Sequence, residues 1–80
     1  MYYVYALQSM RDGGLYIGIT NNLERRIAEH NSGQNRSTKS RAPFKIVYKE
    51  LQLDRIQARL REKFLKSGCG REYLKQIIPR

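Results

Sequence analysis

Two short runs rich in aromatic and β-branched residues, joined by a turn cluster, constrain the fold of this chain most strongly. Residues 2–8 are YYVYALQ and residues 15–20 are LYIGIT, and the SMRDGG between them contains the Asp and Gly residues typical of turns. Runs of this composition predict β-strands. Because the connection is short, the two strands are predicted to pair antiparallel as a hairpin.

The register of this hairpin decides which aromatic residues share a face of the sheet. Side chains alternate along a strand, so the aliphatic residues of the second strand point to one face and Tyr16 points to the other. Tyr3, Tyr5 and Leu7 join Tyr16 if odd residues of the first strand share a face with even residues of the second. A shift of one residue would separate them, and the sequence leaves both registers open.

A helix over about residues 22–32 is predicted next, and its inward stripe is half polar. The stripe consists of Leu23, Arg26, Ile27 and His30, at the i, i+3, i+4 and i+7 spacing of a face that packs on a core. An inward guanidinium and imidazole indicate a role beyond packing. On the opposite side of this helix, Arg25 and Glu29 are predicted to form a solvated ion pair.

Three further elements and two helix caps are predicted from the rest of the pattern. Residues 44–50, FKIVYKE, alternate as a third strand, and a helix runs from Asp54 to about residues 67–68, followed by a last helix, REYLKQII, at residues 71–78. The predicted caps are Asn21 with Glu24 for the first helix and Asp54 with Gln57 for the second. The order β-β-α-β-α-α predicts an α+β fold in one domain, residues 1–80.

The helix after Asp54 has two stripes of different character. One consists of Ile56, Leu60 and Phe64, and the other of Ala58, Glu62 and Leu65. The carboxylate of Glu62 therefore lies within an apolar stripe. The basic residues around it give the helix the charge expected of a surface that faces DNA; they are Arg59, Arg61, Lys63 and Lys66.

The charge of the chain predicts a polyanionic partner. Sixteen Lys and Arg residues against seven Asp and Glu residues give a formal net charge of +9. Nucleic acid is the usual partner of a small basic domain, with an anionic membrane surface and simple solubility as the alternatives. The segment GQNRSTKSRAP, residues 33–43, is predicted to be a loop that is either a solvated linker or a set of phosphate contacts through Arg36, Thr38, Lys39 and Arg41.

Several classes of protein are excluded by what the sequence contains. Cys69 is the single cysteine, so no intramolecular disulfide forms, and no second cysteine stands at zinc-ligand spacing. Within SGCG it is predicted to be a small residue in a turn. No apolar run approaches the roughly 20 residues of a membrane span, and the N-terminus lacks the basic start of a secretion signal. No membrane association and a reducing cytoplasm are therefore expected.

The unusual residues together suit the cleavage of a phosphodiester bond. The set consists of Tyr5, Tyr16, Arg26, His30 and Glu62. A guanidinium can bind two phosphate oxygens, a single carboxylate can hold a hydrated divalent ion, and a phenol can accept a proton if its pKa falls. Because an ordinary tyrosine has a pKa of about 10, neighbouring cations would have to lower it.

The same residues resemble a known family. The triplets YVY at residues 3–5 and YIG at residues 16–18, an Arg eight residues after that glycine and a His four residues later are similar to the GIY-YIG nuclease superfamily. The similarity continues through STKSRAPFKIVYKE and ARLREKFLKSGCGREYLK, which resemble small stand-alone members that are excision-nuclease-like. The resemblance implies a three-stranded antiparallel β-sheet flanked by helices, in agreement with the predicted order of elements.

The resemblance also implies a role for each site residue. Tyr5 would be the general base or shuttle the proton of the attacking water, and Tyr16 would orient that water and the scissile phosphate. Arg26 would stabilise the pentavalent transition state, and His30 would assist proton transfer or position the phosphate. Glu62 would be the only protein ligand of a single Mg²⁺ or Mn²⁺ ion.

The implied activity is a metal-dependent endonuclease acting on DNA, structure-directed or weakly specific, in repair or recombination. The residues expected to contact the nucleic acid are Gly18, by permitting close backbone approach, and Arg36, Thr38, Lys39, Arg41, Arg59 and Lys63.

Two departures from the family pattern keep alternatives open. Tyr3 stands where the first triplet usually has glycine, and no Asn occurs after Asn35, although one often follows the metal-binding glutamate in the family. A nucleic-acid-binding module of the same fold without turnover is the alternative prediction. A structural RNA binder is a third, which would prefer RNA over DNA through contacts to the 2′-hydroxyl.

Overall fold

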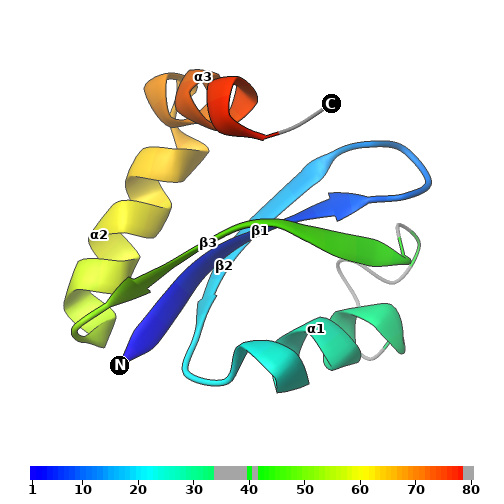
Figure 1. Cartoon of the computed structure of the whole chain (residues 1–80), viewed down its shortest axis with the longest axis horizontal. Coiled ribbons are helices and arrows are strands. Elements are labelled where there is room, and N and C mark those ends of the chain that lie inside the picture. Colours follow the sequence, from blue (N-terminus) through cyan, green and yellow to red (C-terminus); the bar gives the residue numbers. More distant parts are fainter. Residues whose placement is uncertain (34–39, 41, 79–80) are drawn as a thin grey trace.

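The computed structural model describes residues 1–33, 40 and 42–78, and its elements follow the predicted order (Figure 1). They are β1 (Tyr2–Ser9), β2 (Leu15–Thr20), α1 (Leu23–Asn31), β3 (Phe44–Gln52), α2 (Arg55–Lys66) and α3 (Gly68–Ile77). The prediction of an α+β fold with the order β-β-α-β-α-α is confirmed.

The three strands form one antiparallel sheet with β1 at its centre, in the order β2-β1-β3. Tyr5 lies opposite Gly18 and Leu7 lies opposite Tyr16. Residues directly opposite in a sheet share a face, so Tyr5, Leu7 and Tyr16 point to the same side. Of the two registers that the sequence left open, the structure therefore has the one that brings the two tyrosines together.

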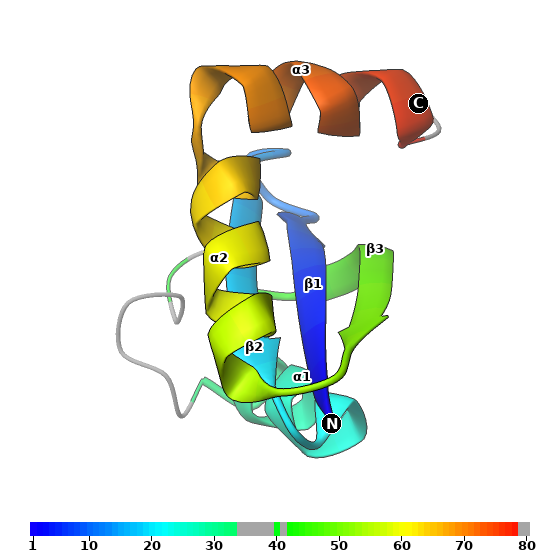
Figure 2. The same ribbon diagram turned by 90° about the vertical axis from the view of Figure 1, so that its left-hand side faces the viewer.

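Each face of the sheet packs against different helices, because alternate residues of β1 belong to different cores. Val4 and Ala6 pack with Ala58 and Leu65 of α2 and with Leu74 of α3. On the other face, the buried residues Tyr5, Leu7 and Phe44 pack with the α1 residues Leu23 and Ile27. Figures 1 and 2 show α2 and α1 on opposite sides of the strands. The sheet thus separates α1 from the two C-terminal helices.

The N-cap of the first helix is Asn22, so the prediction of Asn21 was wrong by one residue. The Asn22 side chain accepts a hydrogen bond from the backbone N–H of Arg25 at 3.1 Å. Its own N–H donates to the Thr20 hydroxyl at 3.1 Å, which holds the chain extended before the helix. The second predicted cap is confirmed, since Asp54 accepts from the N–H of Gln57 at 2.9 Å.

The last helix begins three residues earlier than predicted. Ser67 caps it by accepting from the N–H of Gly70 at 3.2 Å, so residues 68–70 form the first turn of α3. The prediction that Cys69 lies in a turn between helices was wrong for this reason, although the residue is exposed. A serine cap outweighed the low helix propensity of two glycines.

The α2 stripe of Ala58, Glu62 and Leu65 is buried, whereas Ile56 and Leu60 are exposed. The stripe that contains the carboxylate is therefore the one that faces the sheet. Within the described part of the chain, no helix is sufficiently long and apolar to cross a membrane.

The packing at the junction between α2 and α3 predicts that two glycine substitutions differ in their effect on stability. A Cβ at Gly70 would lie 2.0 Å from the Phe64 carbonyl oxygen and 2.4 Å from the Leu65 Cα, and backbone atoms cannot yield as a side chain can. Gly70→Ala is expected to lower the free energy of unfolding by about 1–3 kcal/mol. Gly68→Ala is the matched control, since a Cβ at Gly68 meets nothing within 4 Å. Chemical denaturation measures both, and equal stability of the two variants would contradict this packing.

Candidate active site

The hydroxyl of Tyr5 lies between a guanidinium and an imidazole. Tyr5 Oη accepts a hydrogen bond from Arg26 Nε at 3.4 Å, and it lies 3.4 Å from His30 Nε2. Tyr5 is 1% exposed and His30 is fully buried. Both distances are at the long end of the range for hydrogen bonds. Three of the residues predicted to form one site are therefore in contact.

The fold brings these residues together because α1 packs along the Tyr5 face of the sheet. Leu23 and Ile27 anchor the helix against that face. Arg26 and His30 are four residues apart, so they project from the same side of α1, one turn from each other. The Arg26 side chain is 34% exposed and also lies 3.6 Å from the Glu29 carboxylate. Glu29 thus pairs with Arg26, and the predicted Arg25–Glu29 pair was wrong.

Gly18 leaves the space into which Tyr5 fits. A Cβ at Gly18 would lie 2.6 Å from Tyr5 Oη and 2.8 Å from Tyr5 Cζ. Any side chain at this position of β2 would displace the phenol from Arg26 and His30. Gly18 is buried, and the close approach that its missing Cβ permits is that of the Tyr5 ring. Its predicted contact with nucleic acid stays a prediction.

Tyr16 completes an aromatic cluster around the imidazole. Its ring centroid lies 4.8 Å from that of His30 and 6.5 Å from that of Tyr5. The ring centroid of Phe44, which lies on β3, is 5.9 Å from that of His30. Since β2 is an edge strand and Tyr16 is half-buried, its ring stands where the buried cluster meets the surface.

Asn31 fixes one wall of the site, and no sequence pattern indicated this role. Its side-chain amide donates to the Phe44 carbonyl at 3.2 Å, and its side-chain oxygen accepts from the Phe44 N–H at 2.6 Å. The two bonds join the end of α1 to the start of β3. Asn31 therefore holds Phe44 against the imidazole of the preceding residue.

Burial sets the protonation states of the cluster. The pKa of Tyr5 is raised, mainly because the phenol is desolvated, and the nearby charge of Glu62 adds to the increase. Arg26 lowers the pKa of Tyr5, as the sequence led us to expect, but burial outweighs it. The pKa of His30 is lowered, first by burial and then by the positive charge of Arg26. At neutral pH, Tyr5 is a phenol and His30 is a neutral imidazole.

Arg26 is the charged member of this group of three residues. Its hydrogen bond to Tyr5 raises the pKa of the guanidinium above its ordinary value. The site therefore combines one permanent cation with two neutral groups that can exchange a proton. This combination can bind an anion and move a proton beside it.

Glu62 approaches the cluster from the α2 side of the sheet. Its carboxylate is 7% exposed and binds two cations, Arg59 Nη1 at 2.9 Å and Lys66 Nζ at 3.3 Å. These two ion pairs do not leave Glu62 in solvent, because its side chain is buried. Its negative charge also raises the pKa of Tyr5.

The donor set fits a divalent ion held mainly by its substrate. Among the described residues no group of three or more His, Cys, Asp or Glu side chains is placed to hold a metal. A carboxylate has about four lone-pair positions, and the two cations occupy one on each oxygen of Glu62. Mg²⁺ is often bound by one or two carboxylates together with phosphate oxygens and waters. Glu62 can therefore supply one ligand.

The predicted nucleic-acid contacts are only partly covered by the structure. Arg59 and Lys63 are exposed on α2, with Arg59 engaged by Glu62. Arg36, Thr38, Lys39 and Arg41 lie outside the described residues. The contacts of all six with nucleic acid stay predictions.

Two cations that the sequence did not single out share a pocket with Tyr16. They are Arg71 and Lys75 of α3. Their spacing of four residues, on the polar side of a helix, was the only signal in the sequence.

Comparison with known proteins shows which family the chain is similar to. Residues 1–73 match the family described as the GIY-YIG catalytic domain. A UPF0213 protein of Staphylococcus haemolyticus is 39% identical over 80 residues, covering 99% of this chain and 96% of the relative. One of Clostridium perfringens is 45% identical over 78 residues, covering 96% and 83%. One of Desulfotalea psychrophila is 48% identical over 67 residues, and the match spans 81% of this chain but 60% of that protein.

A solved structure has the same architecture. The solution NMR structure of the UPF0213 protein BH0048 from Bacillus halodurans matches with a TM-score of 0.57 and 34% identity, covering 95% of this chain and 84% of that one. Tyr5, Tyr16, Arg26, His30 and Glu62 all fall within the range matched by the family.

The lowered pKa of His30 predicts how stability depends on pH. The folded protein binds the proton less well than the unfolded chain, whose histidine has a pKa of about 6.5. The contribution of neutral His30 to the free energy of unfolding is therefore fully present above about pH 6.5. It is lost as the pH falls through the folded pKa. His30 is the only histidine, so an NMR titration of its imidazole is expected to give a pKa below the ordinary value. The His30→Gln variant is expected to lose less stability than the wild type over that interval. An ordinary or raised pKa would contradict the proposed environment.

Proposed function

Because the chain belongs to the family of the GIY-YIG catalytic domain, we propose that it is a metal-dependent endonuclease that hydrolyses phosphodiester bonds in DNA. One observation carries the proposal: a buried phenol is held between a guanidinium and a neutral imidazole. Burying an apolar layer of the same shape would cost less free energy, because buried polar groups must be desolvated. The formal net charge of +9 suits a polyanionic substrate.

The phosphate is expected to meet Arg26 first. The Arg26 side chain is partly exposed and bonds the phenol from the outer side, whereas Tyr5 is almost fully buried. A guanidinium can donate to two phosphate oxygens at once. Its charge becomes more valuable as negative charge builds on the phosphoryl oxygens in the transition state. Arg26 is therefore the residue to which we assign transition-state stabilisation.

Tyr5 and His30 form a path for the proton of the attacking water. The phenol takes that proton while its own O–H proton passes to His30 Nε2, 3.4 Å away. The water oxygen bonds to phosphorus as the leaving oxygen departs, and the imidazolium holds the proton. The charge of Arg26 opposes an imidazolium in the resting site. A bound phosphate offsets that charge, so the relay is favoured when substrate is present.

The family implies a divalent ion, and Glu62 is the residue that would hold it. When bound, Mg²⁺ or Mn²⁺ would neutralise charge on the phosphate and supply a bound water acidic enough to protonate the leaving oxygen. Tyr16, whose ring packs on His30 at the rim of the cluster, would orient the phosphate. A role in DNA repair or recombination in the cytoplasm accords with this chemistry.

One observation favours a second candidate, a module of the same fold that binds nucleic acid without turnover. Both oxygens of Glu62 are already neutralised by Arg59 and Lys66. A metal ion must displace or share these contacts, and no Asn follows Glu62 in the sequence to assist. Binding falls with salt in both candidates, so only strand scission separates them.

The deciding experiment is cleavage of labelled single-stranded, flapped and branched DNA by the purified protein with Mg²⁺ or Mn²⁺. Metal-dependent nicking is expected, and EDTA and the Glu62→Gln substitution are expected to abolish it. Glu72→Gln is the matched control, because Glu72 is 69% exposed on α3. Binding without scission of any substrate would select the binding module. Full activity of Glu62→Gln with unchanged Mg²⁺ dependence would show that the metal is held elsewhere.

Arg26→Ala is expected to lower kcat about 10²–10³-fold while leaving the fold nearly unchanged, because the charge is needed most in the transition state. Arg25→Ala removes the same charge from an exposed position of the same helix and is expected to retain activity. Single-turnover rates and thermal melting of both variants provide the comparison. Retained cleavage by Arg26→Ala would overturn the assignment.

A further inference from the structure

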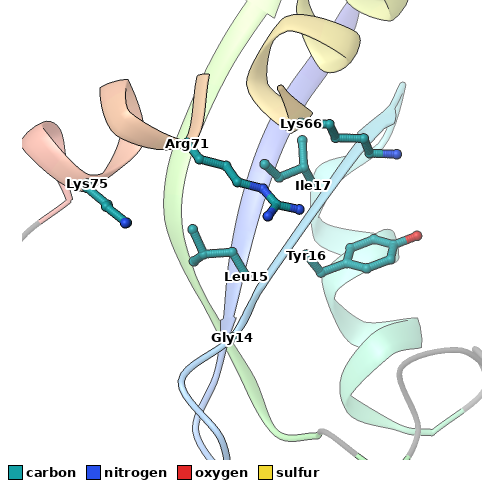
Figure 3. A pocket seen from close by; sticks show the side chains of 7 residues that line it. All are labelled: Gly14, Leu15, Tyr16, Ile17, Lys66, Arg71 and Lys75. Carbon is teal, nitrogen blue, oxygen red and sulfur yellow. The ribbon is translucent and has the colours of Figure 1, made fainter. Parts of the chain in front are cut away.

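A basic groove with Tyr16 in its lining lies beside α3. It has a volume of about 560 Å³ and lies between the start of β2 and the facing sides of α2 and α3. Leu15 and Ile17 are in its floor, and Lys66, Arg71 and Lys75 bring three cations to it (Figure 3). This volume is in the usual range for pockets that bind small ligands.

The charges of the groove favour an anion. No Asp or Glu is among the residues that line it. Lys66 contacts Glu62, and Lys75 contacts Glu72 weakly at 3.5 Å, with both side chains 69% exposed. Within the described residues, Arg71 has no ion pair, and its guanidinium extends over the floor (Figure 3). An anionic group can thus bind here without breaking a strong contact of Arg71.

The floor of the groove distinguishes its ligand from a simple phosphate. Leu15 is half-buried and Ile17 is 8% exposed, so aliphatic side chains form a surface beneath the cations. An apolar surface under a cationic rim suits a nucleotide, whose base covers the floor while its phosphate meets the cations. In a duplex, each base is stacked and paired, and it is not free to lie on such a surface.

The position of the groove connects it to the catalytic cluster. Tyr16 lines one end of it, and the Tyr16 ring lies 4.8 Å from that of His30. Figure 3 shows the Tyr16 hydroxyl directed away from Arg71, so the ring stands between the groove and the cluster. A strand whose phosphate lies at Arg26 can therefore continue past Tyr16 toward Arg71 and Lys75.

We propose that this groove binds the unpaired nucleotides next to the scissile phosphate, and that the substrate is nucleic acid with a single-stranded segment. The inference rests on the proposed function and specifies its substrate class. It assigns Arg71 and Lys75 to the phosphate backbone and the Leu15 and Ile17 surface to a base.

Binding without turnover tests the groove independently of catalysis. The affinities of the wild-type protein for a short oligothymidylate and for a blunt duplex of equal length are measured in EDTA at several salt concentrations. The double variant Arg71→Ala with Lys75→Ala is compared with Lys45→Ala with Lys49→Ala. The control pair is also exposed, also four residues apart, and lies on β3 at the opposite edge of the sheet.

The wild type is expected to bind the single strand more tightly than the duplex. The groove variant is expected to lose about tenfold or more in single-strand affinity, and its salt dependence is expected to fall by about 1.4 in log–log slope, since each lost contact removes about 0.7. The control variant is expected to lose less. Equal losses in the two variants, or tighter binding of the duplex by the wild type, would overturn the proposal.

An abasic oligonucleotide tests the floor separately from the charges. It carries the same phosphates, so weaker binding than that of oligothymidylate supports a base on Leu15 and Ile17, and equal binding contradicts it. These results do not depend on cleavage. If the wild type binds the single strand through Arg71 and Lys75 but cuts no DNA, the endonuclease proposal fails and the groove stands; if it cuts DNA with both variants binding alike, the groove fails alone.

Discussion

The close approach of the Tyr5 ring to the backbone of Gly18 is the contact on which the rest of the site depends. The antiparallel register of β1 and β2 places these two residues opposite each other. Because Gly18 has no side chain, the phenol fits against the edge strand and reaches the side of α1 that carries Arg26 and His30. A different register or any larger residue would leave the three groups apart.

The charged residues near the cluster lie on different sides of the sheet, and this sets the charge around Tyr5 and His30. Arg26 lies on the α1 side with the two neutral groups, whereas Glu62 lies among the residues of α2 and is paired with cations there. Burial raises the pKa of the phenol and lowers that of the imidazole, so both groups are neutral at neutral pH. In the proposed function, a bound phosphate would supply the negative charge that this arrangement lacks and so couple substrate binding to proton transfer.

Local patterns predicted most of the secondary structure and failed where two neighbouring groups compete. Asn21 and Asn22 are equivalent as caps by composition, and the Thr20 hydroxyl decided in favour of Asn22. The start of α3 was missed because two glycines argue against a helix, whereas the Ser67 cap and the packing of Gly70 on α2 favour one. Glu29 had two arginines within reach on one helix, and in the structure it pairs with Arg26, which also bonds Tyr5.

The sequence by itself determined the order of elements, the polar stripe of α1 and the positions of Tyr5, Tyr16, Arg26, His30 and Glu62, because spacing along a helix or strand assigns a residue to a face. Tertiary structure alone decided which faces meet. The hairpin register, the Asn31 bonds to Phe44 and the groove formed by β2 and α3 join residues that are distant in the chain. Such contacts depend on how helices pack across a sheet, and a periodic pattern contains no information about the partner that a face will find.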